Sequence, residues 1–362
     1  MIGMDERDRI RERINAIDER ILEALTERVL LAREIGEYKK KVGLPVIDVA
    51  RENAVLRRIG EEAARKSLPR ELTESVYREI MRLCRSVQME ETKVAFLGPR
   101  GTFCEQAARE HFRDVNAIFD ERPSIADVFR SVRVHEADSG VVPIENSNEG
   151  SVVTTLDLLN ESDLKISGEV ILRITHNLIV KPDTRLNEIR EVASHPQALA
   201  QCRLYLKENL PSARLVETRS TADAVKLASE RDEVAAIGTE MAAQLSGLRV
   251  LASGIEDNRE NQTRFFVLGR EDHKPTGKDR TSVLFSVRHR PGSLYEALAT
   301  LSSRMINLTK IESRPARGKP WEYIFFCDFE GHRKDAKCQD ALEELQRRTI
   351  DMKILGSYPR AQ

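Results

Sequence analysis

The stretch that decides the fold is KVAFLG at Lys93–Gly98, followed closely by TFCEQAAREHF at Thr102–Phe112. KVAFLG is a short apolar run typical of a buried strand, whereas TFCEQAAREHF has the apolar spacing of a helix. A repeated strand–helix order predicts an α/β domain with a mostly parallel sheet. The order returns in SGVVPIE and SVVTTLDLLN (139–160), REVASH and PQALAQCRLYLKEN (190–209) and EVAAIG and TEMAAQLSG (233–247), and TRFFVLG (263–269) is expected to add a strand.

Upstream of this domain the sequence is helical. No proline precedes Pro45, so the first helix is expected to run from about Asp5 to Lys41, over roughly 50 Å. A helix of that length is expected to pack against a partner. Two more helices are expected, at Val49–Arg65 and from Pro69 to about Met89. Apolar residues three and four apart share one face of the first helix: Ile10, Ile14, Ile17, Ile21 and Leu25.

Downstream, Glu271–Asp279 is polar, contains Pro and Gly, and is expected to be a linker. The sequence after Arg280 predicts the order βαββαβ and therefore a ferredoxin-like sandwich. We expect three domains, over residues 1–91, 92–272 and 281–362. The predicted elements of the last one are TSVLFSV (281–287), PGSLYEALATLSSRM (291–305), NLTKIESRP (307–315), WEYIFFCDFEG (321–331), DALEELQRRT (340–349) and MKILGSYP (352–359).

The chain has 362 residues, with 58 Lys and Arg against 59 Asp and Glu and a formal net charge of −1. This balance predicts neither a nucleic acid nor a membrane as partner, and no apolar run is long enough to span a bilayer. The 5 cysteines are widely spaced without a C-x-x-C pair, and the 7 histidines are scattered. We therefore expect a cytoplasmic protein with reduced thiols, no metal and no other cofactor.

Charged residues of the helical region fall on common helix faces. Arg28 and Lys39 lie about 16 Å apart along one face, so their long side chains could converge on a small dianion. Ala32 and Ile35 lie between them and would form an apolar floor. Arg11 is about 25 Å from Arg28, so it could serve the same ligand only from a second subunit. On spacing alone, a solvated charged face is the alternative. Two further sets share a face: Met81, Cys84 and Gln88, and Asp48, Arg51 and Glu52.

This region resembles the all-helical chorismate mutase domain of the bifunctional chorismate mutase–prephenate dehydratases. The resemblance is carried by RERINAID (11–18), Arg28, Lys39, DVARE (48–52) and CRSVQ (84–88). It implies that chorismate is held in a chair while charge developing on its ether oxygen is stabilised. The resemblance implies that Arg28 and the partner's Arg11 bind the carboxylates and that Lys39 and Gln88 bind the ether oxygen. It also implies that Glu52 and Asp48 bind the ring hydroxyl and that Arg51 supports the site. Cys84 stands where the family usually has Ser, and a thiol is the poorer donor.

Four segments of the middle domain stand out. GPRGTFC (98–104), PIENSNEG (143–150) and SHPQALAQC (194–202) lie at predicted strand-to-helix junctions, where open α/β sheets bind ligands. The fourth is Thr263-Arg264-Phe265. From the pattern alone, Gly and Pro that merely mark turns remain the alternative.

The four segments in this order resemble the prephenate dehydratase domain, whose fold is two α/β lobes with a cleft, like periplasmic binding proteins. The resemblance implies that prephenate loses carbon dioxide and water, with Thr263 as the essential hydroxyl and Arg264 as a carboxylate-binding or orienting group. The proton source stays open between Glu145, Glu149 and His195, and Cys104 is not expected to be a nucleophile. Polar lining is expected from Thr102, Asn146, Ser147 and Thr221.

Two segments of the last domain, PGSLY (291–295) and IESRP (311–315), resemble the signatures of phenylalanine-binding ACT domains. Glycine at 292 would let a ligand approach the backbone, Glu312 could meet an amino group, and Ser293 replaces the usual Ala. An ordinary strand end is the alternative for ESRP. The residues implied in phenylalanine binding are Gly292, Ser293, Leu294, Glu312, Ser313 and Arg314.

Together the resemblances imply a bifunctional enzyme of phenylalanine biosynthesis, an isomerase and a lyase, which converts chorismate to prephenate and then to phenylpyruvate. Phenylalanine is expected to inhibit it through the ACT domain, and the chain is expected to form a homodimer or a higher homo-oligomer. A Rossmann-type prephenate dehydrogenase would need G-x-G-x-x-G after a strand, and GPRGTF lacks that spacing. Arogenate dehydratase activity and a non-catalytic amino-acid sensor remain the alternatives.

Overall fold

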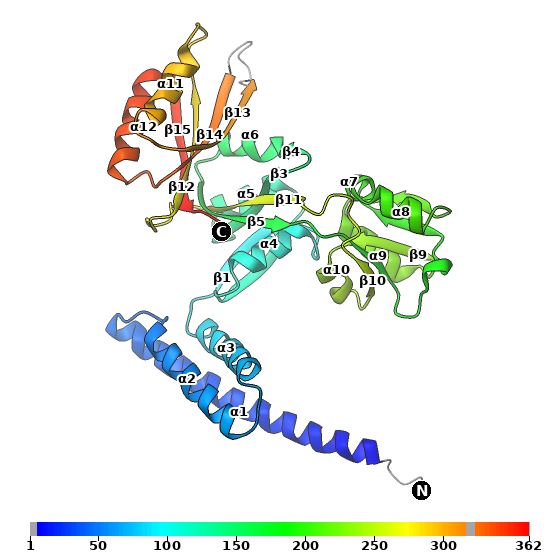
Figure 1. The fold of residues 1–362 in the computed structure, drawn as a ribbon. Coiled ribbons are helices and arrows are strands. Elements are labelled where there is room, and N and C mark those ends of the chain that lie inside the picture. Colours follow the sequence, from blue (N-terminus) through cyan, green and yellow to red (C-terminus); the bar gives the residue numbers. More distant parts are fainter. Residues whose placement is uncertain (1–5, 316–322, 362) are drawn as a thin grey trace. The chain divides into compact units, whose positions relative to one another are not determined.

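The computed structural model describes residues 6–315 and 323–361. The chain divides into two compact units, Met1–Thr92 with Phe112–Ile118, and Lys93–His111 with Phe119–Gln362. Figure 1 shows a helical first unit, and a second unit built around three sheets. Within the described ranges, none of the helices has the length and apolar content that crossing a membrane requires.

The first unit consists of α1 (Glu6–Val42), α2 (Val49–Arg65) and α3 (Arg70–Ser86). The three predicted helices are confirmed. Asp5 lies outside the described residues, and α3 ends three residues before Met89. Helix α1 is unbroken and ends at Gly43, whose φ of +72° is a left-handed conformation that glycine adopts without strain.

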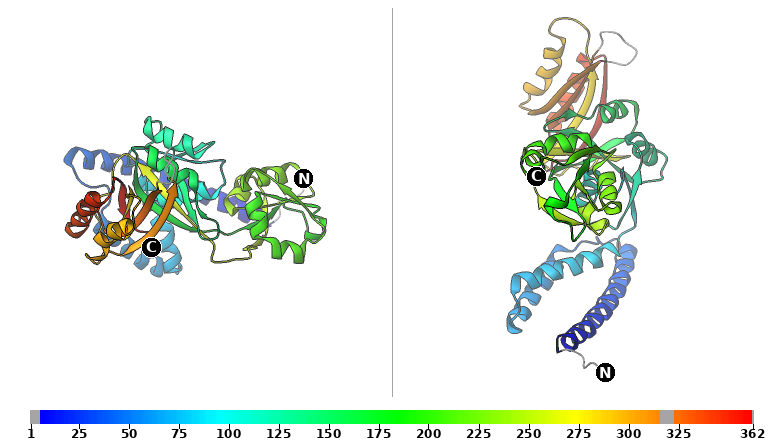
Figure 2. Two further views of the ribbon diagram at one scale, coloured as in Figure 1. Left: turned by 90° about the horizontal axis from the view of Figure 1, so that it is seen from above. Right: turned by 90° about the vertical axis from the view of Figure 1, so that its right-hand side faces the viewer.

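Helix α3 packs against both α1 and α2, and the buried residues of α1 in the described part of the chain are Ala32 and Gly36. The first part of α1 extends beyond the other two helices (Figures 1 and 2). The isoleucines at 10, 14, 17 and 21 are each 51% or 52% exposed, although their spacing places them on one face. A continuous apolar stripe of this kind normally packs against another helix.

The second unit begins with two lobes of α/β structure. The first lobe contains a sheet of order β2-β1-β3-β11-β5, with β4 paired to β3. Its strands are β1 (Thr92–Leu97), β2 (Ala117–Arg122), β3 (Ser139–Asn146), β4 (Gly150–Ser151), β5 (Lys165–Arg173) and β11 (Gln262–Gly269), and its helices are α4 (Phe103–His111), α5 (Ile125–Arg133) and α6 (Val153–Glu161).

The second lobe is inserted between β5 and β11 and has a sheet of order β10-β6-β9-β7-β8. Its strands are β6 (Asn177–Val180), β7 (Glu191–Ser194), β8 (Arg214–Glu217), β9 (Val234–Gly238) and β10 (Arg249–Ser253). Its helices are α7 (Pro196–Gln201), α8 (Arg203–Asn209), α9 (Thr221–Glu230) and α10 (Glu240–Leu245), with a short 3-10 turn at Leu186–Glu188.

The expectation of a mostly parallel sheet was wrong, because both sheets are mixed. Strand β3 is parallel to β1, and β7 is parallel to β8 and β9. However, β11 is antiparallel to β3 and β5, and β6 is antiparallel to β9 and β10. Strand β5 leads out to the second lobe and β11 leads back, so the two run in opposite directions. No helical crossover joins them, and the parallel arrangement that such crossovers impose is absent there.

The last part of the second unit confirms the predicted βαββαβ order. It contains β12 (Asp279–Ser286), α11 (Ser293–Ser302), β13 (Leu308–Pro315), β14 (Tyr323–Glu330), α12 (Ala336–Arg348) and β15 (Asp351–Pro359). The antiparallel sheet has the order β13-β14-β12-β15, with α11 and α12 on one side (Figure 1). Trp321 and Glu322, which were predicted to open a strand, lie outside the described residues.

Both faces of this sheet are buried. Val283 and Phe285 of β12 pack in the core beneath α11 and α12. Leu284 between them belongs to a core that also contains Ile166 and Phe266 of the first lobe. Because side chains alternate along a strand, one face of the sheet packs on its own helices and the other packs on the first lobe.

Candidate active sites and effector site

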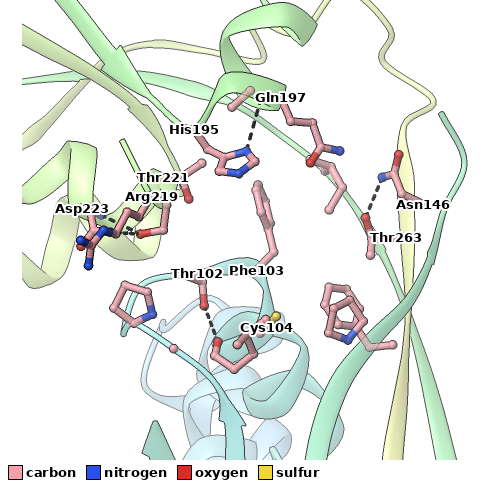
Figure 3. A pocket seen from close by; sticks show the side chains of 18 of the residues that line it. Thr102, Phe103, Cys104, Asn146, His195, Gln197, Arg219, Thr221, Asp223 and Thr263 are labelled. Carbon is pink, nitrogen blue, oxygen red and sulfur yellow. Dashed lines mark hydrogen bonds between the residues drawn. The ribbon is translucent and has the colours of Figure 1, made fainter. Parts of the chain in front are cut away.

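A cavity of about 720 Å³ lies between the two lobes of the second unit. It is lined by the ends of strands and the starts of helices from both lobes, as Figure 3 shows. Four of the expected residues line it, together with one of the three proton-source candidates: Thr102, Asn146, Thr221, Thr263 and His195.

Asn146 and Thr263 are cross-strand partners on β3 and β11, and their side chains meet in the cavity wall (Figure 3). The Asn146 carbonyl Oδ1 accepts hydrogen bonds from the backbone N–H groups of Asn148 and Glu149, at 3.0 and 3.2 Å. This orients the amide so that Nδ2 donates to Thr263 Oγ1 at 2.8 Å. Since the threonine oxygen already accepts a hydrogen bond, its own O–H proton is free to be donated to a ligand.

A chain of amides continues from this pair along the wall. Asn146 Nδ2 also donates to Asn261 Oδ1 at 2.8 Å, and Asn261 Nδ2 donates to Gln201 Oε1 at 3.1 Å. His176 Nε2 lies 2.9 Å from the same oxygen, so Nε2 carries the proton in this arrangement. Among the described residues, Gln201 Nε2 and His176 Nδ1 are buried without a hydrogen-bond partner. One unpaired donor and one unpaired acceptor therefore belong to side chains that line the cavity.

His176 is held neutral by its surroundings. Burial lowers the pKa of the imidazole, and it outweighs the hydrogen bond that Nε2 donates to Gln201 and the charge of Glu256, which act in the opposite direction. The sequence interpretation missed both His176 and Gln201. Gln201 lies within SHPQALAQC and could have been found as a helical residue four positions after Gln197. His176 belongs to no quoted motif.

The other lining residues are held by local structure. His195 is the N-cap of α7, and its Nδ1 accepts the backbone N–H of Gln197 at 3.3 Å. Thr221 begins α9, two residues after Arg219, an exposed cation that also lines the cavity. Arg219 was not expected from sequence. It supplies positive charge at a helix N-terminus, where an anion is already favoured.

Cys104 also lines the cavity, at the start of α4. Burial raises the pKa of its thiol to about 12, so the thiol stays protonated at neutral pH. This supports the expectation that Cys104 is not a nucleophile.

The structure does not bring Arg264 into the cavity, and this placement contradicts its expected contact with a substrate carboxylate there. Its guanidinium is buried on the opposite face of the sheet, 2.7 Å from Glu169 Oε2 and 2.6 Å from Asp328 Oδ2. The physical reason is strand alternation: if Thr263 points into the cavity, the next side chain must point away.

Three further expected residues lie outside the cavity lining. Ser147 is exposed, and its Oγ accepts the backbone N–H of Gln262 at 3.0 Å. Glu149 is exposed, and Glu145 forms an ion pair with Lys310 of β13 at 2.9 Å. Of the three candidate proton sources, His195 is therefore the one that borders the cavity.

In the helical unit, the packing of α1 against α3 brings together several of the expected mutase residues. Arg28 Nη1 contacts Cys84 Sγ, and Gln88 Nε2 donates to the Cys84 carbonyl at 2.8 Å. Lys39 Nζ donates to the Val46 carbonyl at 2.6 Å. Gly36 lets helix α1 approach Gln88 closely, because a Cβ atom at position 36 would lie 2.8 Å from Gln88 Cγ.

One of the two residues expected to form the apolar floor between Arg28 and Lys39 is buried. Ala32 is buried, but Ile35 is 46% exposed. The buried neighbour of Ala32 is Gly36, one helical turn away. Spacing predicted the general face of α1 correctly and misplaced its centre by about one residue, which corresponds to 100° of rotation.

The second helix contributes differently from what was expected. Asp48 is the N-cap of α2, and its Oδ1 accepts the backbone N–H of Arg51 at 2.9 Å. Glu52 forms an ion pair with Arg85 at 2.9 Å, so a half-buried cation stands beside the carboxylate. Arg85 was missed, although it lies inside CRSVQ. The side chains of Arg51 and Arg11 are exposed, and Arg11 lies 3.7 Å from Asp8.

The two expected effector segments lie on different elements of the last domain, the start of α11 and the strand β13. Gly292 is the N-cap of α11 with φ +84°, and Ser293 Oγ is buried without a partner in the described part of the chain. Leu294 packs against the core of this domain. On β13, Glu312 contacts Ser151 Oγ, Arg314 lies 3.6 Å from Asp157, and Ser313 is exposed.

Comparisons with known proteins agree with this arrangement. Family models described as Chorismate mutase type II, Prephenate dehydratase and ACT domain match residues 10–89, 94–273 and 281–347. A bifunctional chorismate mutase/prephenate dehydratase of Aquifex aeolicus (strain VF5) is 44% identical over 361 residues, 99% of this chain and 99% of that protein.

Solved structures resemble the second unit. The structure of prephenate dehydratase from Arthrobacter aurescens in complex with L-Phe has a TM-score of 0.68 and 38% identity, and the match covers 74% of this chain and 90% of that one. A structure described as GqqA, a novel type of quorum quenching acylase, also has a TM-score of 0.68, with 32% identity, and covers 74% of this chain and 97% of its own.

Proposed function

The chain belongs to the family of bifunctional chorismate mutase/prephenate dehydratases, and we propose that residues 1–91, 92–272 and 281–362 carry its mutase, dehydratase and regulatory functions. The protein is an enzyme that rearranges chorismate to prephenate, then decarboxylates and dehydrates prephenate to phenylpyruvate. Its ACT domain makes it subject to inhibition by phenylalanine.

The observation that carries the dehydratase proposal is the hydrogen bond from Asn146 to Thr263 Oγ1. Because Thr263 Oγ1 accepts this bond, its own O–H can be donated to the departing ring hydroxyl of a bound substrate. Loss of carbon dioxide supplies the electron pair that expels this hydroxyl, and the ring becomes aromatic. Thr263 is too weak an acid to be the ultimate proton source, so it relays or shares a proton.

The carboxylates of prephenate need cations in the cleft, and Arg264 cannot supply one from the opposite face of the sheet. We assign this role to Arg219, which lines the cavity beside the N-terminus of α9. Gln201 Nε2, which has no hydrogen-bond partner in the described part of the chain, is a second donor for a carboxylate or keto oxygen. Both groups bind the ground state and the transition state, so they orient the diacid rather than perform the chemistry.

In the mutase unit, we assign the chorismate carboxylates to Arg28 and the ether oxygen to Lys39 and Gln88. Arg28 and Gln88 both contact Cys84, where α1 packs on α3. Glu52, held by Arg85, binds the ring hydroxyl. Arg11 acts from the α1 helix of a second copy. The exposed isoleucine stripe supports a homodimer or a higher homo-oligomer through this face.

In the ACT domain, we assign the amino group of phenylalanine to Glu312 and the backbone approach to Gly292 and Ser293. Ser293 Oγ at the start of α11 is buried without a partner among residues 6–315 and 323–361, which supports a polar ligand at this end of the helix. A cytoplasmic location is proposed as well, because all five cysteines are free and buried.

The test is to supply chorismate to the purified protein, with and without phenylalanine, and to identify the products. The proposal expects prephenate and then phenylpyruvate, with phenylalanine lowering the second rate. Prephenate and arogenate are then compared as substrates of the dehydratase, and preference for arogenate would overturn the assigned substrate. Glu312→Ala is expected to relieve inhibition at little cost to turnover, and unchanged inhibition would count against Glu312 as the amino-group ligand.

A further inference from the structure

The face of the dehydratase sheet behind the cleft carries a second cross-strand pair. Thr263 and Asn146 are partners on β11 and β3, and the adjacent partners are Arg264 and Glu145. Since successive side chains point to opposite faces of a sheet, this second pair faces away from the cleft. Both of its members are held by residues of the ACT domain.

Arg264 lies at the centre of a buried polar cluster that joins the two domains. From the ACT domain, Asp328 Oδ2 accepts from Nη1 at 2.6 Å and Tyr358 OH accepts from Nη2 at 2.9 Å. From the dehydratase domain, Glu169 Oε2 accepts from Nε at 2.7 Å, and it is also bound by Arg280 of β12 at 2.6 Å. Two positive and two negative side chains are thus paired out of water, and removing one would leave a buried charge without its partner.

Glu145 is held by the strand that bears the effector signature. Lys310 Nζ lies 2.9 Å from Glu145 Oε1, 3.4 Å from Glu312 Oε2 and 2.8 Å from Ser151 Oγ. Lys310 and Glu312 occupy alternate positions of β13, so they share the face that meets the dehydratase domain. The carboxylate assigned to the effector and the carboxylate beside Asn146 therefore share one lysine.

We propose that Arg264 and Glu145 are positioning residues through which the ACT domain sets the placement of Thr263 and Asn146. The proposal rests on the proposed role of Glu312 as the ligand of the effector's amino group. An ammonium group bound at Glu312 repels Lys310 Nζ, and this displaces the lysine from its contact with Glu145. The backbone of β3 then shifts at Asn146, the donor that orients the Thr263 hydroxyl.

The test uses the full-length protein with Lys310→Met, which keeps the length of the side chain and removes its charge. The dehydratase kcat is expected to fall about 5-fold or more with KM nearly unchanged, because the substrate ligands stay in place while the Asn146–Thr263 pair is misaligned. The mutase rate is expected to be unchanged. Allosteric couplings are typically about 5- to 150-fold. Inhibition by saturating phenylalanine is expected to shrink severalfold in Lys310→Met. Lys310→Arg is expected to restore both the kcat and the inhibition.

Lys353→Met is the matched control. Lys353 also reaches from the ACT domain to the dehydratase domain, where its Nζ donates to the carbonyls of Leu159, Asn160 and Ser162 at 2.9, 2.9 and 2.5 Å. None of these residues adjoins Asn146 or Thr263. The control is therefore expected to keep the wild-type kcat and the wild-type inhibition.

A second variant, Asp328→Asn, tests the Arg264 side of the proposal, and a lower kcat at constant KM is expected. Wild-type kcat and inhibition in Lys310→Met, or equal losses in Lys353→Met, would overturn the inference. Wild-type protein that phenylalanine neither binds nor inhibits would refute the proposed regulation instead. In that case the kcat of Lys310→Met without effector still decides whether the ACT domain positions the catalytic pair.

Discussion

In the dehydratase cleft, Asn146 and Thr263 come from neighbouring strands and bond each other at 2.8 Å, with a chain of amides behind them. In the mutase unit, the expected ligands lie along helices whose apolar side is half exposed. A cavity between two lobes has its lining residues within one chain. A long helix offers only one row of ligands and leaves a face open for another helix, so the proposed mutase site needs a second copy of the chain.

Thr263→Ala should produce the largest effect in the cleft. Removing the one hydroxyl that Asn146 orients is expected to lower the dehydratase kcat by about 10²- to 10³-fold, as when a preorganised donor is deleted elsewhere. Chorismate conversion should then stop at prephenate, which product analysis detects. Thr263→Ser, which keeps the hydroxyl, is the control, and a serine variant as inactive as alanine would argue against the hydroxyl's role.

Lys39→Ala tests the other side of the comparison. Loss of the point charge assigned to the ether oxygen is expected to lower the mutase rate by about 10²-fold and to leave prephenate dehydration unchanged. Both rates are measured on the same preparation with chorismate or prephenate as substrate. Lys40→Ala, whose lysine is exposed and paired with Glu90, is the matched control. Equal loss of both activities would refute separate sites.

Ile17→Asp addresses the open face of α1. A charge in the middle of the stripe is expected to weaken association of two chains and to lower the mutase rate by about 10-fold, because Arg11 would no longer reach the partner's ligand. Sedimentation at several protein concentrations measures the association, and prephenate dehydration should persist. Leu72→Asp introduces the same charge at an exposed apolar residue of α3. A fully active monomeric Ile17→Asp variant would contradict completion by assembly.

The smallest expected effect concerns acid stability. The pKa of His176 is lowered, chiefly by burial, so below the ordinary value of about 6.5 the unfolded chain takes up a proton that the folded chain resists. This group therefore stabilises the fold above that pH, and the contribution is lost as pH falls toward the lowered value.

Urea unfolding of the full-length protein at pH 7 and pH 5, followed by far-ultraviolet circular dichroism, measures this loss. His176→Asn keeps a polar side chain that does not titrate in this range, so it is expected to lose less stability between the two pH values than the wild type. Equal losses in the two proteins would show that His176 does not contribute.

The sequence by itself determined the three domains' element types, the long first helix and the βαββαβ order, because periodicity and proline placement are local properties. Asn146 and Thr263 also fall within two motifs that are visible in the sequence, PIENSNEG (143–150) and Thr263-Arg264-Phe265. Which side of β11 faces the cleft was decided by tertiary structure: Thr263 points inward, so Arg264 points to the ACT domain.

Other features depended on tertiary contacts that no local pattern encodes. His176 and Gln201 become wall residues only because an inserted lobe brings β6 and α7 beside β11, and Arg85 acquires its role only when α3 packs against α2. The mixed sheets follow from one chain leaving the first lobe and returning to it. Periodicity reports the environment of a residue along its own element, whereas these properties depend on which distant element covers it.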